Sequence, residues 1–470
     1  MPRNRNSFNA FSYPLLKIPG KFLVRCALAI LSGLVCALAF PPFGWWPLIL
    51  PGLVGLLVSL DGQHGTRARI LGFLYGYTAL GVGLSWVWNI FGPLSIVLWA
   101  VLAALPAGFA HFQGRAFLHG LRGWKFAAFT AVNWCAWEFI RAELIPLKFP
   151  WMTAGLAIGP NMLLPWIGVY AVGAIVVFAA AALTTRMWKS ACVALAVLAA
   201  SLVFSRPYAS LQPGRDGVIE VAGVQLENVS IDSYIKDTKA MPAGVDHVVW
   251  PEYAVPYDIR ENKRDWQILL DLCREKDITL TFGTQSRPGG GDAWRNIAIT
   301  MDATGFLGEH TKVHTVHMFD DGTPGKLSEP VPTPFGKVGT PICFDCDYEG
   351  IARGMTAGGA EYFVVPTMDA ESWSARQHDQ HAELARIRAA ENGRWMFVVA
   401  TSGVSQLIDP AGHLHARLGA MKQGTIHGFL KRETGLTFYT RFGWILPWCI
   451  LTSVAASWIL LMFSKRKPAA

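Results

Sequence analysis

The stretch Gly339-Thr-Pro-Ile-Cys343-Phe-Asp345-Cys346-Asp347 ends an apolar segment with a cysteine that acidic residues follow at once. Lys337–Ile342 is predicted to be a buried strand. A thiol at the end of a strand is held in place, while the loop that follows leaves it reachable. An isolated cysteine is nevertheless more often a small core residue than a nucleophile. The chemistry of Cys343 therefore depends on which other side chains the fold brings to it.

Two upstream segments carry the groups that such a thiol needs. Val248-Val249-Trp250-Pro251-Glu252 is predicted to be an apolar strand that ends at a glutamate, and Lys312 follows a turn at Gly308. A buried carboxylate has a raised pKa and can take the proton of a thiol, and a fixed ammonium can stabilise the oxyanion that forms. The order of Glu252, Lys312 and Cys343 is the pattern of the nitrilase (carbon–nitrogen hydrolase) superfamily. Asp345 is predicted to orient its neighbours rather than to act as a second base.

Other readings of the same residues stay open. Cys343 and Cys346 form a C-x-x-C pair, which could bind zinc together with histidines or close a disulfide in an oxidising compartment. The sequence also holds two H-x-x-H pairs, His314 with His317 and His378 with His381. Because these pairs lie far apart in the chain and Asp345 sits inside the C-x-x-C, we predict no metal and no cofactor.

The composition indicates a membrane protein. Of the 470 residues, 52% are hydrophobic and only 16% are charged, and 19 are tryptophan, which is common at membrane interfaces. The net charge of +8 is scattered between apolar runs, so it does not predict a nucleic-acid partner. Apolar runs of about the ~20 residues that span a bilayer as a helix lie at 22–40, 45–60, 70–90, 94–118, 126–144, 162–184, 190–204 and 443–463.

The domain organisation follows from these runs. We expect a basic cytoplasmic tail at 1–21, a seven-helix membrane domain at 22–205, a soluble domain at 217–433, a C-terminal transmembrane helix at 443–463 and a cytoplasmic tail at 464–470. One alternating set of loops and tails carries fifteen lysines and arginines, whereas the short loops of the opposite set carry Arg141 and Lys148. The positive-inside rule then places both termini in the cytoplasm and the soluble domain in the periplasm of the bacterial inner membrane.

Strands alternate with helices in residues 217–433, which predicts two packed sheets with helices outside, an αββα sandwich. The charged residues Arg386, Arg388 and Arg394 lie on or after a predicted helix, and a solvated helix face is expected for most of them. The predicted strands are 217–226, 243–250, 279–283, 297–301, 305–310, 337–342, 362–366, 395–401 and 404–408, and the predicted helices are 264–276, 348–358 and 374–392.

Across nearly its whole length the chain resembles the apolipoprotein N-acyltransferase family. The resemblance is carried in order by Phe40-Pro-Pro-Phe-Gly-Trp-Trp-Pro-Leu48, Gly83-Leu-Ser-Trp86-Val-Trp88, Trp137-Glu-Phe-Ile-Arg141, Phe149-Pro-Trp151, Arg388-Ala-Ala-Glu-Asn-Gly-Arg394, Thr401-Ser-Gly-Val-Ser405, Ile408-Asp-Pro-Ala-Gly412 and Thr437-Phe-Tyr-Thr-Arg-Phe-Gly443.

This resemblance implies a multi-pass membrane domain of about eight spans joined to a nitrilase-like domain. It implies Glu252 as the general base, Lys312 as the oxyanion stabiliser and Cys343 as the nucleophile. A phospholipid, typically phosphatidylethanolamine, is the implied donor of a fatty acyl chain. The implied acceptor is the N-terminal amine of a diacylglyceryl-cysteine lipoprotein.

The segment after Lys312 departs from the family. Where the family has a motif like Leu-Val-Pro-Phe-Gly-Glu-Tyr, this chain has Thr315-Val-His-Met-Phe-Asp320-Asp321, and we expect Asp320 to stand for the essential glutamate. The chain from Lys312 to Cys343 is also shorter than in the family, which trims the predicted lid at 313–336. The alternative hypothesis is therefore a membrane-tethered amidase or acyltransferase of the same class with another substrate, such as a conjugal-transfer-associated relative.

Overall fold

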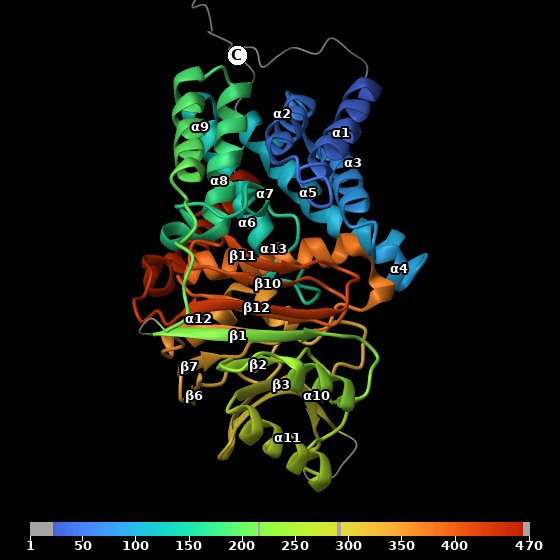
Figure 1. Cartoon of the computed structure of the whole chain (residues 1–470). Coiled ribbons are helices and arrows are strands. Elements are labelled where there is room, and N and C mark those ends of the chain that lie inside the picture. Colours follow the sequence, from blue (N-terminus) through green and yellow to red (C-terminus); the bar gives the residue numbers. More distant parts are fainter. Residues whose placement is uncertain (1–21, 215–216, 289–292, 464–470) are drawn as a thin grey trace, which may run out of the picture.

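The computed structural model describes residues 22–214, 217–288 and 293–463. The two predicted tails, 1–21 and 464–470, lie outside the described residues. A helical bundle and an α/β domain lie one above the other in Figure 1, with the bundle at the top.

Most helices of the bundle overlap the predicted apolar runs, whereas the short helix α7 (Ala154–Ile158) lies between two of them. By length and composition, three helical segments of the described chain are long and apolar enough to cross a membrane: Leu94–Leu118, Leu164–Thr184 and Tyr439–Phe463. Phe22–Ala37, Trp46–Leu60 and Trp188–Val203 are shorter apolar helices, so the total of eight spans stays a prediction. The bundle and its loops contain α1 (Phe22–Ala37), α2 (Ile49–Leu60), α3 (Gly65–Gly83), α4 (Val87–Phe91), α5 (Leu94–Leu118), α6 (Gly123–Phe139), α7 (Ala154–Ile158), α8 (Leu164–Thr184), α9 (Trp188–Val203) and α14 (Ile445–Phe463).

Two six-stranded sheets form the α/β domain. The first has the strand order β12-β1-β2-β3-β4-β5 and the second the order β11-β10-β9-β8-β7-β6. The inner strands β1, β2 and β3 pair in parallel, as do β7, β8 and β9, and antiparallel strands flank both sets. The strands are β1 (Val218–Gln225), β2 (His247–Val249), β3 (Thr279–Ser286), β4 (Arg295–Asp302), β5 (Gly305–Thr311), β6 (Val331–Thr333), β7 (Gly336–Gly339), β8 (Tyr362–Thr367), β9 (Met396–Ala400), β10 (Ser405–Ile408), β11 (Leu414–Leu418) and β12 (Gly424–Lys431).

Three apolar clusters hold the layers together. Side chains of both sheets, among them Val221, Val364 and Phe397, form the core between them. A second cluster packs α10 (Ile231–Ala240) and α11 (Lys263–Lys276) on the first sheet, and a third packs α12 (Glu349–Ala357) and α13 (Ala375–Asn392) on the second. The domain is thus a nitrilase-like αββα sandwich, as the sequence predicts.

Helix α13 packs against both the bundle and the second sheet. Leu384, Ile387 and Ala390 on one side of this helix join the apolar core of the bundle, whereas Ala385 and Ala389 join the core of the second sheet. In Figure 1, α13 runs across the molecule between the bundle and the sheets. The two parts therefore share a packed interface, and α13 belongs to both.

The structure corrects the expectation for Arg388 on α13 and for Arg394, which lies two residues after this helix. Arg388 and Arg394 are each 1% exposed rather than solvated. Arg388 forms an ion pair with Glu391, whose carboxylate also accepts a hydrogen bond from the backbone amide of Val169 in α8. Arg394 donates to the carbonyl of Ala360 over 2.6 Å. Because both guanidinium groups are removed from water, they bind buried acceptors instead.

Candidate active site

Glu252 and Lys312 meet beyond the ends of two strands of the first sheet. Glu252 follows β2 and Lys312 follows β5 directly. The Lys312 Nζ lies 2.7 Å from Glu252 Oε1, and each residue is 1% exposed. Gly283 of β3 makes the approach possible, because a Cβ there would collide with the backbone of Glu252 and Tyr253.

Asp321 is the second carboxylate on the lysine. Its Oδ2 lies 2.8 Å from Lys312 Nζ and also accepts the backbone N–H of Val316. Asn296 of β4 donates to Glu252 Oε1 over 2.6 Å and to Asp321 Oδ1 over 2.9 Å. One ammonium and one amide thus hold two carboxylates in a fixed arrangement.

Asp320, which the family motif points to, lies elsewhere. Its side chain is exposed and accepts a hydrogen bond of 3.1 Å from Trp294 Nε1. The chain turns at Met318, whose φ of +69° is in the left-handed region, and this turn brings Asp321 rather than Asp320 to Lys312. The structure therefore brings Asp321, and not Asp320, into the cluster around Lys312.

Cys343 begins a tight turn, η4 (Cys343–Asp347), which follows strand β7 of the second sheet. Strand β7 ends at Gly339, earlier than predicted, and Cys343 has a φ of +49°, a strained conformation that is typical of functional positions. Its Sγ lies 3.5 Å from the carbonyl oxygen of Met368, and the amide of Met368 donates to Glu252 Oε2 over 2.8 Å. Met368 thus contacts the thiol through its backbone carbonyl and the glutamate through its backbone amide.

The electrostatics of the cluster follow from its burial. Burial raises the pKa of the Cys343 thiol well above its ordinary value; Glu252 raises this pKa further, and Lys312 opposes both. Burial also raises the pKa of Glu252, which Lys312 lowers in part and Asp321 raises. The resting thiol is therefore protonated, and the carboxylate beside it has an increased proton affinity, as a general base needs.

Asp345 is bound from several directions. Its Oδ1 accepts the amides of Val313 and His314, over 3.1 and 2.8 Å, and its Oδ2 lies 3.0 Å from His310 Nε2. Burial acts to raise the pKa of Asp345, but these bonds lower it overall. Through these hydrogen bonds, the Asp345 carboxylate connects the segment after Lys312 to the turn that contains Cys343.

The described residues contain no group of three or more His, Cys, Asp and Glu side chains that could hold a metal ion. Cys346 and Cys343 are both free thiols, and Cys346 packs in an apolar cluster with Ile351 and Met355. His314 stacks on Tyr348 instead of joining the pair at His378 and His381. The geometry thus favours the acid–base cluster over a zinc site.

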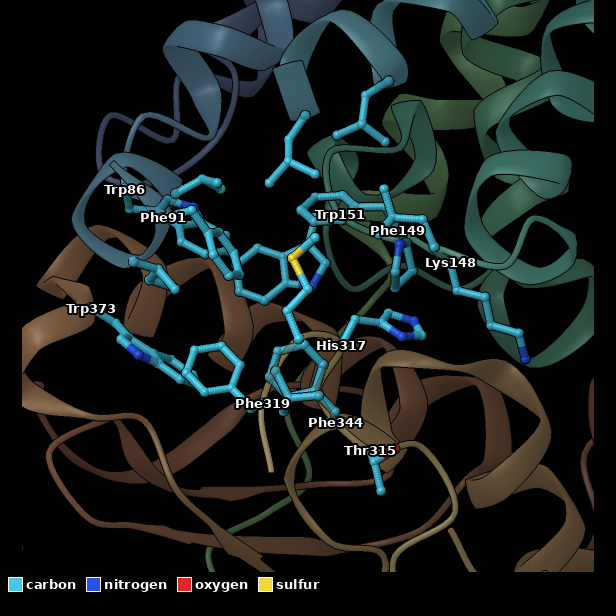
Figure 2. A pocket seen from close by; sticks show the side chains of 18 of the residues that line it. Trp86, Phe91, Lys148, Phe149, Trp151, Thr315, His317, Phe319, Phe344 and Trp373 are labelled. Atoms are coloured by element: carbon cyan, nitrogen blue, oxygen red, sulfur yellow. The ribbon is translucent and has the colours of Figure 1, made fainter. Parts of the chain in front are cut away.

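An apolar cavity that is partly open to solvent lies between the bundle and the α/β domain. Its floor includes Thr315–Phe319, which connects Lys312 to Asp321, and Phe344, which follows Cys343. Figure 2 shows aromatic rings from both parts of the molecule around this space: Trp86, Phe91, Phe149, Trp151, Phe319, Phe344 and Trp373. The reactive cluster therefore adjoins an apolar cavity that is lined by both parts of the molecule.

Three participants were not evident from the sequence: Asn296, Asp321 and the backbone of Met368. Asn296 points inward from a strand without any local motif. Asp321 differs from the predicted residue by one position. Met368 acts through its amide and carbonyl, which no side-chain pattern reveals.

The αββα fold and the buried cluster at its strand ends define a carbon–nitrogen hydrolase domain, here joined to apolar helices. Residues 209–435 match the family model described as carbon–nitrogen hydrolase, and residues 32–182 match the apolipoprotein N-acyltransferase N-terminal domain. Together the two models cover most of the chain. The chain is thus similar to the apolipoprotein N-acyltransferase family over most of its length.

Individual relatives cover nearly the whole chain. Apolipoprotein N-acyltransferase of Pseudomonas aeruginosa is 26% identical, over 92% of this chain and 95% of its own. The protein of that name from Azotobacter vinelandii is 28% identical, over 92% and 94%. Among solved structures, Saccharomyces cerevisiae Nit3, a nitrilase superfamily member, is 23% identical over 48% of this chain and 94% of its own, with a TM-score of 0.41. The relatives and the apolar helices indicate a bacterial membrane protein.

Proposed function

We propose that this protein is an acyltransferase that moves a fatty acyl chain from a phospholipid, through a thioester on Cys343, to the N-terminal amine of a diacylglyceryl-cysteine lipoprotein. The observation that carries the proposal is the position of the buried cluster, which adjoins an apolar cavity walled by apolar helices. A lipid tail fits such walls, whereas a small polar amide would leave them solvated. The names of the relatives point to the same acceptor.

In the first half-reaction Glu252 takes the proton of Cys343, and the thiolate attacks the ester carbonyl of the donor. Lys312 is the cation closest to the base, so we assign it to the oxyanion that develops. When the intermediate collapses, the carbon–oxygen bond of the ester breaks. Glu252 then gives its proton to the departing lysophospholipid oxygen, and the acyl chain stays on sulfur.

In the second half-reaction the amine of the acceptor attacks the thioester. Glu252 receives a proton from the amine, the carbon–sulfur bond breaks, and the proton passes to the sulfur, which restores the thiol. The product is an amide. Asp321 and Asn296 keep Lys312 and Glu252 in place during both halves, because they bind the same two charged groups.

The membrane arrangement belongs to the same proposal. Eight spans would place both termini in the cytoplasm and the α/β domain in the periplasm of the inner membrane. There the domain would meet phospholipids and lipoproteins at the membrane surface. Phosphatidylethanolamine is the donor that we propose to test first.

Intact-protein mass spectrometry provides the test. After incubation of the detergent-purified protein with phosphatidylethanolamine, we expect one added acyl mass that neutral hydroxylamine removes, because that reagent cleaves thioesters. Adding a synthetic diacylglyceryl-cysteine peptide should discharge the adduct and yield an N-acylated peptide.

The Cys343→Ala protein serves as the control and should gain no mass. If the wild-type protein gains none either, while its Cys343 thiol is free and titratable, phospholipid is not the donor. The alternative, an amidase or acyltransferase with another substrate, would then replace this proposal. A thioester that forms but does not discharge to the peptide would retain the donor and reject the acceptor.

The Asp321→Asn substitution is expected to slow thioester formation by roughly 10–100-fold, the loss that follows when a hydrogen bond to a charged group is removed. It should also move the acid limb of the pH–rate profile to lower pH. The sign follows from the structure, because the Asp321 charge raises the pKa of Glu252 and its removal lowers that pKa. Rates of thioester formation measured across a pH series test both effects.

Asp320→Asn is the matched control, one residue away and exposed. Its rate and pH profile should match those of the wild-type protein. If Asp320→Asn loses activity and Asp321→Asn does not, the assignment of Asp321 to the cluster is wrong.

A further inference from the structure

A second buried charged cluster lies behind Cys343, centred on His381 of α13. The His381 Nδ1 lies 2.8 Å from Asp369 Oδ1, and its Nε2 lies 3.2 Å from Asp347 Oδ1. The three residues are at most 6% exposed. Two aspartates from different loops of the second sheet thus share one imidazole, and neither the family motif nor the reaction described above uses it.

Asp369 connects this cluster to the reacting groups. It directly follows Met368, whose amide binds Glu252 and whose carbonyl accepts from Cys343. Besides His381, the Asp369 carboxylate accepts a hydrogen bond of 2.9 Å from Gln377, and its backbone carbonyl accepts one of 3.2 Å from Thr401. By fixing Asp369, His381 therefore also restrains Met368, whose two adjacent peptide groups orient the base and the nucleophile.

Asp347 connects the cluster to the bundle. Its Oδ2 accepts a hydrogen bond of 2.7 Å from Trp151 Nε1. The Trp151 ring also stacks on the His381 ring, with centroids 5.8 Å apart and an interplanar angle of 13°. Because Trp151 lines the apolar cavity (Figure 2), the wall of the cavity is linked to Met368 through Asp347, His381 and Asp369.

The imidazole and the thiol also face a common space. Cys343, Asp369 and His381 line one narrow gap in the packing. Burial lowers the pKa of His381, but Asp369 and Asp347 outweigh it, so this pKa is raised well above its ordinary value. A protonated His381 balances part of the negative charge that the two aspartates place near Cys343.

We propose that His381 is a positioning residue for the chemistry at Cys343. By bridging Asp347 and Asp369 it holds Met368 where the amide orients Glu252 and the carbonyl orients the thiol. This inference rests on the proposed function for its reaction. It does not depend on the identity of the acyl donor, because the contacts concern the base and the nucleophile.

The same helix offers a matched control for simple packing. His378 lies one turn earlier, is fully buried, and binds the backbone carbonyl of Ala370 over 3.0 Å. It has the same size and burial as His381 but no contact with Met368 or with Asp347 among the bonds of the described residues. A loss caused by packing alone should therefore affect both histidines equally.

The experiment compares His381→Gln with His378→Gln in the full-length protein in detergent. Four quantities are measured: the maximal rate and the apparent KM of thioester formation from phosphatidylethanolamine, the rate of Cys343 alkylation by iodoacetamide followed at the peptide level, and the Tm. We expect His381→Gln to lower the maximal rate about 10–100-fold, the cost of misplacing reacting groups by up to about 1 Å, with the KM within about twofold. His378→Gln should keep most of the wild-type rate.

A double-variant comparison isolates the route through Asp369. Asp369→Asn and His381→Gln should each slow the reaction, and the double variant should be no slower than the slower single variant, because both break the same connection. Losses that multiply in the double variant would overturn the inference. So would a wild-type rate in His381→Gln, or equal losses in rate and Tm for His381→Gln and His378→Gln.

The alkylation measurement separates this inference from the proposed function. It uses no lipid, and we expect His381→Gln to change the rate at Cys343 at least threefold while His378→Gln leaves it unchanged. If the wild-type protein forms no thioester, the proposed function fails, and the alkylation rates still decide the role of His381. Equal alkylation rates in wild type and His381→Gln would overturn the inference even if the lipid reaction is confirmed.

Discussion

Replacing Cys343 with alanine is expected to abolish acyl transfer, with a loss of about 10⁴-fold or more, as for other enzymes that lose a covalent nucleophile. The loss should be complete for the thioester adduct, since no other described thiol lies beside Glu252 and Lys312. The fold should persist, because the substitution removes a single buried sulfur atom. Turnover with lipid and peptide, together with the Tm, checks both expectations.

Cys346→Ala is the control for this prediction. Cys346 is buried in an apolar cluster, three residues after the nucleophile, and its sulfur has a packing role. We therefore expect most of the activity to remain and the Tm to fall slightly. Equal losses for the two cysteines would indicate a redox or metal role of the pair instead of nucleophilic catalysis.

The positions of Glu252, Lys312 and Cys343 could be predicted because each follows a recognisable apolar strand or turn. Strands β2 and β5 run in the same direction in one sheet, with β3 and β4 between them, so both end at the same edge. The residues after each strand then bring Glu252 and Lys312 together at this edge. Cys343 follows β7 of the second sheet, which packs against the first. Alternation of strands and helices was sufficient to predict the sandwich, although not the strands β6, β11 and β12. The partner of β12 is β1, which lies far away in the chain.

The choice between Asp320 and Asp321 could not be made from the sequence. Adjacent residues point in different directions, and which of them faces Lys312 depends on the left-handed turn at Met318. A methionine in the sequence does not predict such a turn, because positive φ is uncommon for residues with a side chain. An irregular segment thus hides the identity of a functional residue even when its location is evident.

The roles of Arg388 and His381 were hidden for another reason. Helix α13 is rich in charged and polar residues, which normally indicates a solvated face. Here one side packs on a sheet and the other on the bundle, so its charged groups are buried and paired. Arg388 pairs with Glu391 on the same helix, and His381 pairs with Asp369 from the loop after β8. The burial that makes these pairs necessary comes from tertiary contacts, which the sequence of the helix does not reveal.

Replacing Lys312 with methionine is expected to have the second-largest effect on the reaction. Thioester formation should fall about 10²–10³-fold, the usual cost of losing one oxyanion-stabilising group. Stability should fall as well, by about 3–5 kcal/mol, because the buried carboxylates of Glu252 and Asp321 lose the cation between them. Single-turnover rates and thermal unfolding in detergent measure the two effects.

The two effects can be separated because the carboxylates have close neutral isosteres. In a Lys312→Met, Glu252→Gln, Asp321→Asn triple variant no buried charge is left uncompensated, so we expect much of the lost stability to return. The rate should not return, since both the cation and the base are absent. A triple variant as unstable as Lys312→Met would show that the lysine stabilises the fold through packing rather than charge. Near-normal thioester formation in Lys312→Met would remove Lys312 from the oxyanion site, and the amide of Asn296 or a backbone N–H near Cys343 would have to supply that stabilisation.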